Sequence, residues 1–124
     1  MLGGVGAVTA PDAARRRSWL RGALVVASSY AANYGIKLVV RRARPQLAGL
    51  EPLTPVVSRL SFPSAHATTS FAAARAFSDV APPALLYGTA VAFALSRPYL
   101  GVHYPSDVVA GAVLGTAIAE GWPA

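Results

Sequence analysis

The chain contains no cysteine, only two histidines and few charged residues, and each scarcity argues against a class of protein. Without cysteine it can form neither disulfides nor thiolate metal sites, and two histidines are a poor basis for a zinc site. Charged residues make up 13% of the 124 residues, against roughly 25% in soluble domains, while apolar residues make up 54%. This composition is typical of a membrane protein with one domain.

Negative charge is scarce as well, because five acidic residues face ten arginines and one lysine, and the net charge is +6. A nucleic-acid-binding protein can carry such a charge, but its cations gather on one polar face among aromatic residues. Here the arginines lie at the ends of apolar segments, so we expect no nucleic-acid partner. Anionic lipid headgroups and an anionic substrate explain the charge better.

Four apolar or alanine-rich segments predict helices, at residues 19–40, 64–80, 84–95 and 106–120. The first would extend about 33 Å, enough to cross a bilayer core of about 30 Å, and the last two are shorter. The first 14 residues, rich in glycine and alanine, predict a flexible leader, which leaves a single domain over 15–124. The sequence therefore predicts an all-α membrane bundle of about four helices.

The segment from Ser96 to Asp107 combines a cation, a histidine and a carboxylate. Arg97 precedes His103 by six positions, and Asp107 follows four positions later in the first turn of a predicted helix. An acid one turn away can hold an imidazole in one tautomer, and such an imidazole can attack phosphorus. Each residue alone has an ordinary structural explanation, but together they indicate phosphate chemistry.

Two further segments carry matching chemistry. One ends an apolar stretch with Lys37 and Arg44, followed by a proline. Its simplest explanation, a basic flank of a membrane helix, accounts for a cluster but not for its particular members. The other places Ser64 as an N-cap before Ala65 and His66, and free N–H groups at a helix start bind phosphate oxygens.

The three segments together resemble the three-part motif of the type 2 phosphatidic acid phosphatase family, which belongs with the vanadium haloperoxidases in one superfamily. The resemblance extends over roughly residues 34–115 and implies a PAP2/haloperoxidase-like helical core. One departure is Ala65, where the family usually has glycine; alanine still offers its backbone N–H to a phosphate. Arg41 and Arg42 do not match the motif spacing, and we expect them to meet lipid headgroups instead.

The resemblance also implies a role for each motif residue. His103 attacks phosphorus to give a phosphohistidine, Asp107 orients it, and His66 protonates the leaving group and then activates water. The phosphate oxygens are expected to be bound by Lys37, Arg44, Ser64, Ala65 and Arg97. The implied reaction is hydrolysis of a phosphate monoester without a metal or other cofactor.

The predicted topology places these residues together. If Arg15–Arg17 lie in the cytoplasm, as the positive-inside tendency predicts, the four helices alternate in direction. Every motif residue then falls at the opposite membrane face. We therefore expect an integral protein of a bacterial plasma membrane with its active site on the outer face.

A site at this position favours a lipid phosphate whose tail stays in the bilayer. Phosphatidic acid, phosphatidylglycerol phosphate and polyprenyl phosphates or diphosphates all qualify. The arginine-rich, lysine-poor composition is typical of a high-GC bacterium, in which a decaprenyl-linked phosphosugar is a further candidate.

Several alternatives remain open at this point. The chain could be a vanadium-dependent haloperoxidase, or a non-catalytic membrane scaffold that binds lipid phosphates. Family members of the membrane type commonly have six spans, so further helices could be needed beside these four. Gly111 and Gly115 form a GxxxG pair, which predicts close helix packing either within the bundle or in a homo-oligomer.

Overall fold

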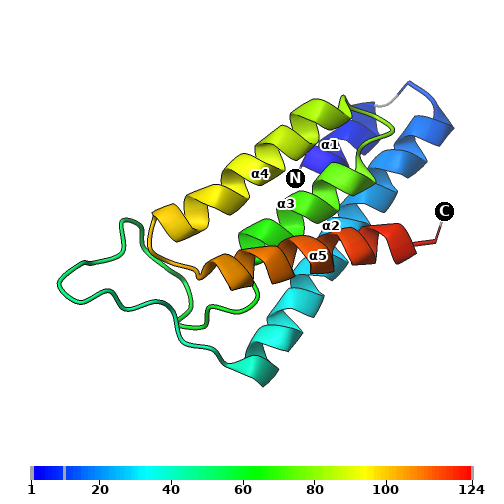
Figure 1. Cartoon of the computed structure of the whole chain (residues 1–124). Coiled ribbons are helices and arrows are strands. Elements are labelled where there is room, and N and C mark those ends of the chain that lie inside the picture. The colour runs from blue at the N-terminus through cyan, green and yellow to red at the C-terminus, as the bar shows by residue number, and fades with distance from the viewer. Residues whose placement is uncertain (1, 10, 124) are drawn as a thin grey trace.

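The protein folds as an all-helical bundle in a computed structural model that describes residues 2–9 and 11–123 (Figure 1). Within these residues there are five helices and no β-strand. The helices are α1 (Leu2–Thr9), α2 (Ala13–Val40), α3 (Ala65–Ala76), α4 (Pro83–Tyr99) and α5 (Pro105–Gly121). The predicted all-α fold class is thereby confirmed, with one short helix more than expected.

Local capping chemistry explains where the long helices begin and end. Asp12 caps α2, its carboxylate accepting the Arg15 backbone N–H at 2.7 Å, and Arg41 ends α2 in a left-handed conformation with φ 52°. Ser64 caps α3. Prolines stand at the first turn of both α4 and α5, where no N–H is needed for an intrahelical bond.

The N-terminal segment differs from its prediction. A flexible leader was expected over residues 1–14, but Leu2–Thr9 forms α1, which packs on α2, and α2 already begins at Ala13. Gly6 lies so close to Trp19 that a β-carbon there would collide with the indole ring. Residues 1 and 10 lie outside the described part of the chain. The predicted boundary between residues 14 and 15 falls inside α2, whereas the single domain predicted over residues 15–124 stays a prediction.

Helix α3 lies at the centre of the bundle and packs against α2, α4 and α5 (Figure 1). Alanines dominate its buried face, at Ala67, Ala72, Ala74 and Ala76. Such small side chains allow the neighbouring helix axes to come close. The core is therefore held by close backbone approach more than by large apolar side chains.

The GxxxG pair of α5 faces α3 of the same chain. A β-carbon on Gly111 would lie 2.6 Å from the Ser64 carbonyl oxygen, and one on Gly115 would collide with the Thr68 carbonyl. This resolves the two readings of the pair in favour of packing within the bundle. The possible homo-oligomer through the Gly111/Gly115 face is not supported, because α3 covers that face.

Helix α2 is, within the described residues, the single helix long and apolar enough to cross a membrane by length and composition. Its 28 residues extend about 42 Å. Helices α4 and α5, with 17 residues each, extend about 26 Å and are shorter than a bilayer core of about 30 Å. The C-terminal ends of α2 and α4 and the N-terminal ends of α3 and α5 meet at one end of the bundle, together with the loop between α2 and α3 (Figure 1).

Candidate active site

A cavity of about 220 Å³ opens at this end of the bundle. It draws its walls from the end of α2, the α2–α3 loop, the start of α3, the end of α4 and the α4–α5 connection. Six of the eight predicted site residues line it: Lys37, Arg44, Ala65, His66, Arg97 and His103. The other two, Ser64 and Asp107, are fully buried behind them.

His103 stands between a carboxylate and a guanidinium. Its Nδ1 lies 3.5 Å from Oδ2 of Asp107, and its Nε2 lies 3.1 Å from Nη1 of Arg44. Because a guanidinium only donates hydrogen bonds, Nε2 of a neutral ring must accept here, and the proton must then sit on Nδ1, on the side of Asp107. In this tautomer the ring lone pair lies on Nε2, where it accepts the hydrogen bond from Arg44.

The surroundings of His103 favour the uncharged ring. The residue is only 5% exposed, and burial together with the cations Arg44 and Lys37 lowers its pKa to about 4, although the carboxylate of Asp107 opposes the shift. At neutral pH the ring is therefore an unprotonated base. A nucleophilic imidazole needs this state.

Asp107 is a fully buried carboxylate with a donor on every side. Its Oδ2 accepts the backbone N–H of Tyr104 at 2.8 Å and the hydroxyl of Ser61, while its Oδ1 accepts Nη1 of Arg42 at 2.9 Å. A buried carboxylate needs such partners to offset the loss of its hydration. The arrangement keeps a negative charge beside the proton-bearing nitrogen of His103.

Arg42 corrects an expectation from the sequence. We expected it, like Arg41, to meet lipid headgroups, but it forms an ion pair with Asp107. The left-handed turn at Arg41 ends the helix, after which Arg42 lies against the start of α5. Ser61, which lies three residues before the predicted phosphate-binding serine, was also missed. No local spacing could have revealed either contact, because the partners lie 65 and 46 residues away.

The three candidate phosphate-binding cations are held in different ways. Lys37 is 5% exposed, and its Nζ donates to the carbonyls of Leu60, Ser61 and Pro63 at 3.0–3.4 Å. Arg44 donates to the carbonyls of Ser58 and Val102 at 2.6 and 2.7 Å. Arg97 has its Nε 3.0 Å from the Ser96 hydroxyl. Backbone carbonyls therefore position Lys37 and Arg44, while Arg97 is tied to its own helix.

The start of α3 presents two of the three residues predicted from it. Ala65 and His66 line the cavity, in the first turn of the helix where backbone N–H groups lack intrahelical partners. The hydroxyl of Ser64 instead accepts the Ala67 N–H at 3.4 Å and is fully buried. Ser64 thus shapes the helix start, and its predicted contact with phosphate stays a prediction.

No group of three or more histidine, cysteine or acidic side chains within residues 2–9 and 11–123 is arranged to hold a metal ion. Three cations and two imidazoles stand in the cavity wall, and one buried carboxylate lies behind it. This set can bind an anion and supply both a nucleophile and a proton carrier.

The family model of the PAP2 superfamily matches residues 18–123. The chain belongs to the PAP2 superfamily. The match includes every candidate site residue, and it confirms the resemblance found in the three motifs.

Proteins similar to this PAP2 chain include phosphatases from several bacteria. A decaprenylphosphoryl-5-phosphoribose phosphatase of Mycolicibacterium smegmatis is 47% identical over 89% of this chain and 60% of its own. The protein of that name from Mycobacterium tuberculosis is 40% identical over 92% of this chain and 63% of its own. A lipid A 1-phosphatase of Rhizobium etli is 34% identical over 79% of this chain and 47% of its own.

A solved PAP2 structure has the same arrangement of helices. It is a transmembrane PAP2-type phosphatidylglycerolphosphate phosphatase from Bacillus subtilis, with a TM-score of 0.62 and 28% identity over 82% of this chain and 55% of that chain. These similarities indicate a membrane protein. The chain spans about three fifths of the length of the mycobacterial relatives.

Proposed function

We propose that this PAP2 chain hydrolyses a lipid phosphate monoester, without a metal ion, through a phosphohistidine intermediate. The observation that carries the proposal is the position of His103. Its Nε2 lies at a cavity lined by three cations, and its Nδ1 faces a buried, ion-paired carboxylate. This geometry supports nucleophilic attack on an anionic phosphorus centre.

The first half-reaction transfers the phosphoryl group to the protein. Nε2 of His103 forms a bond to phosphorus while the bond from phosphorus to the lipid oxygen breaks, and His66 gives that oxygen a proton. Lys37, Arg44 and Arg97 bind the remaining phosphate oxygens, whose negative charge must be stabilised in the transition state. Asp107 offsets the positive charge that the substituted imidazole acquires.

The second half-reaction restores the protein. His66, now neutral, takes a proton from a water molecule whose oxygen attacks phosphorus. The bond between phosphorus and Nε2 breaks, inorganic phosphate leaves, and His103 returns to its starting tautomer. His66 thus serves first as an acid and then as a base, so a single proton carrier is enough for both half-reactions.

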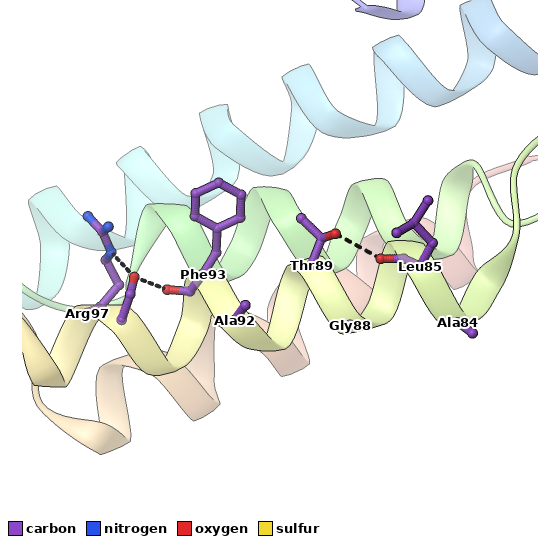
Figure 2. A pocket seen from close by; sticks show the side chains of 8 residues that line it. Ala84, Leu85, Gly88, Thr89, Ala92, Phe93 and Arg97 are labelled. Atoms are coloured by element: carbon purple, nitrogen blue, oxygen red, sulfur yellow. Dashed lines mark hydrogen bonds between the residues drawn. The ribbon is translucent and has the colours of Figure 1, made fainter.

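A groove along α4 supports a lipid as the substrate (Figure 2). It has a volume of about 630 Å³, and small residues such as Gly88 and Ala92 alternate along it with Leu85 and Phe93. Arg97 stands at one end and is also part of the cavity wall. A phosphate bound at Arg97 would leave an attached apolar chain free to lie along α4. The names of the relatives favour polyprenyl-linked phosphosugars among the lipid substrates.

We further propose that the site faces the outer side of a bacterial plasma membrane. Arg15–Arg17 lie at the N-terminal end of α2 and the site lies at its C-terminal end. The positive-inside tendency then assigns the site to the outer face.

The activity is tested by phosphate release from purified protein in detergent with EDTA present. The substrates are phosphatidic acid, phosphatidylglycerol phosphate and a decaprenyl-linked phosphosugar. We expect turnover that EDTA leaves intact and that His103→Ala reduces by about 10⁴-fold or more, as in other enzymes that lose a nucleophile. Quenching with alkaline detergent should trap a phosphoprotein that is stable in alkali and lost in acid, and only in the unmodified chain.

Tyr99→Phe provides the matched control, because Tyr99 is 81% exposed at the same end of the bundle and lies outside the cavity wall. It should retain full turnover. Lipid binding without phosphate release, from a folded protein, would contradict the enzyme and favour the scaffold. Halide oxidation on addition of vanadate would favour the haloperoxidase.

A further inference from the structure

Arg42, which lies outside the three motifs, forms an ion pair with Asp107. The two oxygens of the Asp107 carboxylate have separate partners. Oδ1 lies 2.9 Å from Nη1 of Arg42, whereas Oδ2 faces Nδ1 of His103 at 3.5 Å and also accepts the Tyr104 N–H. Arg42 therefore binds the carboxylate from the side away from the histidine.

Arg42 is itself held in place by the start of α5. Its Nη1 also donates to the Ser106 hydroxyl at 2.8 Å, and its guanidinium carbon lies 4.0 Å from the centre of the Tyr104 ring. The three contacts of Arg42, with Tyr104, Ser106 and Asp107, fix one orientation of the planar guanidinium. A side chain that only met lipid headgroups would not need such fixation.

We propose that Arg42 is a positioning residue that fixes the Asp107 carboxylate so that Oδ2 stays directed at His103. The inference rests on the proposed phosphatase function and extends it to a residue outside the three motifs. With Oδ1 bound to Arg42, rotation of the carboxylate is restricted in both half-reactions. Arg42 acts on phosphorus only through Asp107 and His103.

A direct role in phosphate binding has less support. Arg42 is not part of the cavity wall, whereas Lys37, Arg44 and Arg97 all are. Three cations lie near Asp107 and His103. The charges of Lys37 and Arg44 act on both residues, whereas Arg42 is bonded to Asp107. Without Arg42, the buried carboxylate of Asp107 would still face His103 but would have no cation bonded to it.

The adjacent Arg41 provides a matched control. It is exposed, and Arg41→Gln removes the same charge one residue away from Arg42→Gln. We expect Arg42→Gln to lower kcat by about tenfold to a hundredfold, by analogy with the loss seen when the outer hydrogen-bond partner of a metal ligand is removed. KM should change by less than about twofold, because the groups that bind phosphate remain. Arg42→Lys should recover part of kcat, and Arg41→Gln should match the unmodified chain.

The pH profile supplies a readout that a purely structural role would not move. Without Arg42, no bonded cation offsets the negative charge of Asp107, so this charge favours the protonated ring of His103 more strongly. The acid limb of kcat/KM should therefore move to higher pH in Arg42→Gln and stay in place in Arg41→Gln. A raised KM with unchanged kcat would overturn the proposal, since it would mean that Arg42 binds substrate. Equal kinetics for Arg42→Gln and Arg41→Gln would overturn it as well.

A second measurement is independent of turnover. The ring nitrogens of ¹⁵N-labelled histidine, recorded by NMR in detergent between pH 4 and 8, report the tautomer and protonation of His103. We expect Arg42→Gln to raise the pH at which the ring takes up a proton, with Arg42→Lys intermediate and Arg41→Gln unchanged. Unchanged spectra in Arg42→Gln would refute the positioning role. If the unmodified chain releases no phosphate, the proposed function fails, while these spectra still decide the role of Arg42.

Discussion

His103 shows at the residue scale how burial sets a pH dependence. Its pKa falls to about 4 in the folded protein, because of burial and the nearby Arg44 and Lys37. In the unfolded chain the pKa returns to about 6.5. Between these values the unfolded chain binds a proton that the folded protein excludes. The free energy of unfolding should therefore decrease as the pH falls from about 6.5 to about 4.

Melting temperatures in detergent across this pH range test the assignment. His103→Gln removes the titrating group, so its melting temperature should decline less steeply than that of the unmodified chain. Equal slopes for the two proteins would show that other groups produce the decline.

The site residues show what local sequence can predict. Lys37, Arg44, His66 and His103 occupy fixed places within short motifs, and all four line the cavity. Their convergence follows from alternating helices that end on one side. The pairing of Arg42 with Asp107 depends instead on how a loop after α2 meets the start of α5, which no spacing within one segment encodes.

Helix α5 shows at the element scale how two glycines set a packing distance. We expect Gly115→Ala to destabilise the protein by about 1–3 kcal/mol, because its β-carbon meets the Thr68 backbone, which cannot move aside as a side chain could. Gly88→Ala on α4 is the matched control, since nothing lies within 4 Å of its β-carbon. That change should stabilise α4 by up to about 1 kcal/mol through helix propensity.

Thermal unfolding of both variants, with size-exclusion chromatography in the same detergent, separates packing from association. A loss of stability for Gly115→Ala without a change in size would agree with packing against α3. A change from a larger to a smaller species would instead contradict the intrachain packing.

The helix ends also show why some elements were predicted and one was not. Ser64, which caps α3, and Pro105, the first residue of α5, mark their helices by direct chemistry of the first turn. The predicted starts lie within one residue of those observed. The N-terminal segment carries no such mark. Its glycines argue against a helix, but contact between Gly6 and Trp19 of α2 makes a small residue suitable there. Tertiary packing outweighed local propensity.

The molecule as a whole has its polar site at one end of α2 and the basic cluster at the other. Because the chain has no cysteine, a single introduced thiol reports its side of the membrane. Leu53 is 70% exposed in the loop beside the site, and Asp79 is exposed in the turn after α3. Each can be replaced by cysteine. A membrane-impermeant maleimide should label Leu53→Cys in intact cells, and Asp79→Cys only after permeabilisation. The reverse pattern would place the site in the cytoplasm.

The position of Lys37 in the last turn of α2 has a kinetic consequence for a lipid phosphatase. The helix that is long enough to cross a bilayer ends three residues beyond this cation. If α2 spans the membrane as proposed, the phosphate-binding site would lie at the depth of lipid phosphates. A substrate would then reach the site by lateral diffusion, without leaving its leaflet. Turnover would follow the mole fraction of substrate in the micelle or bilayer. Added inert detergent would therefore slow turnover even when the total substrate concentration is unchanged.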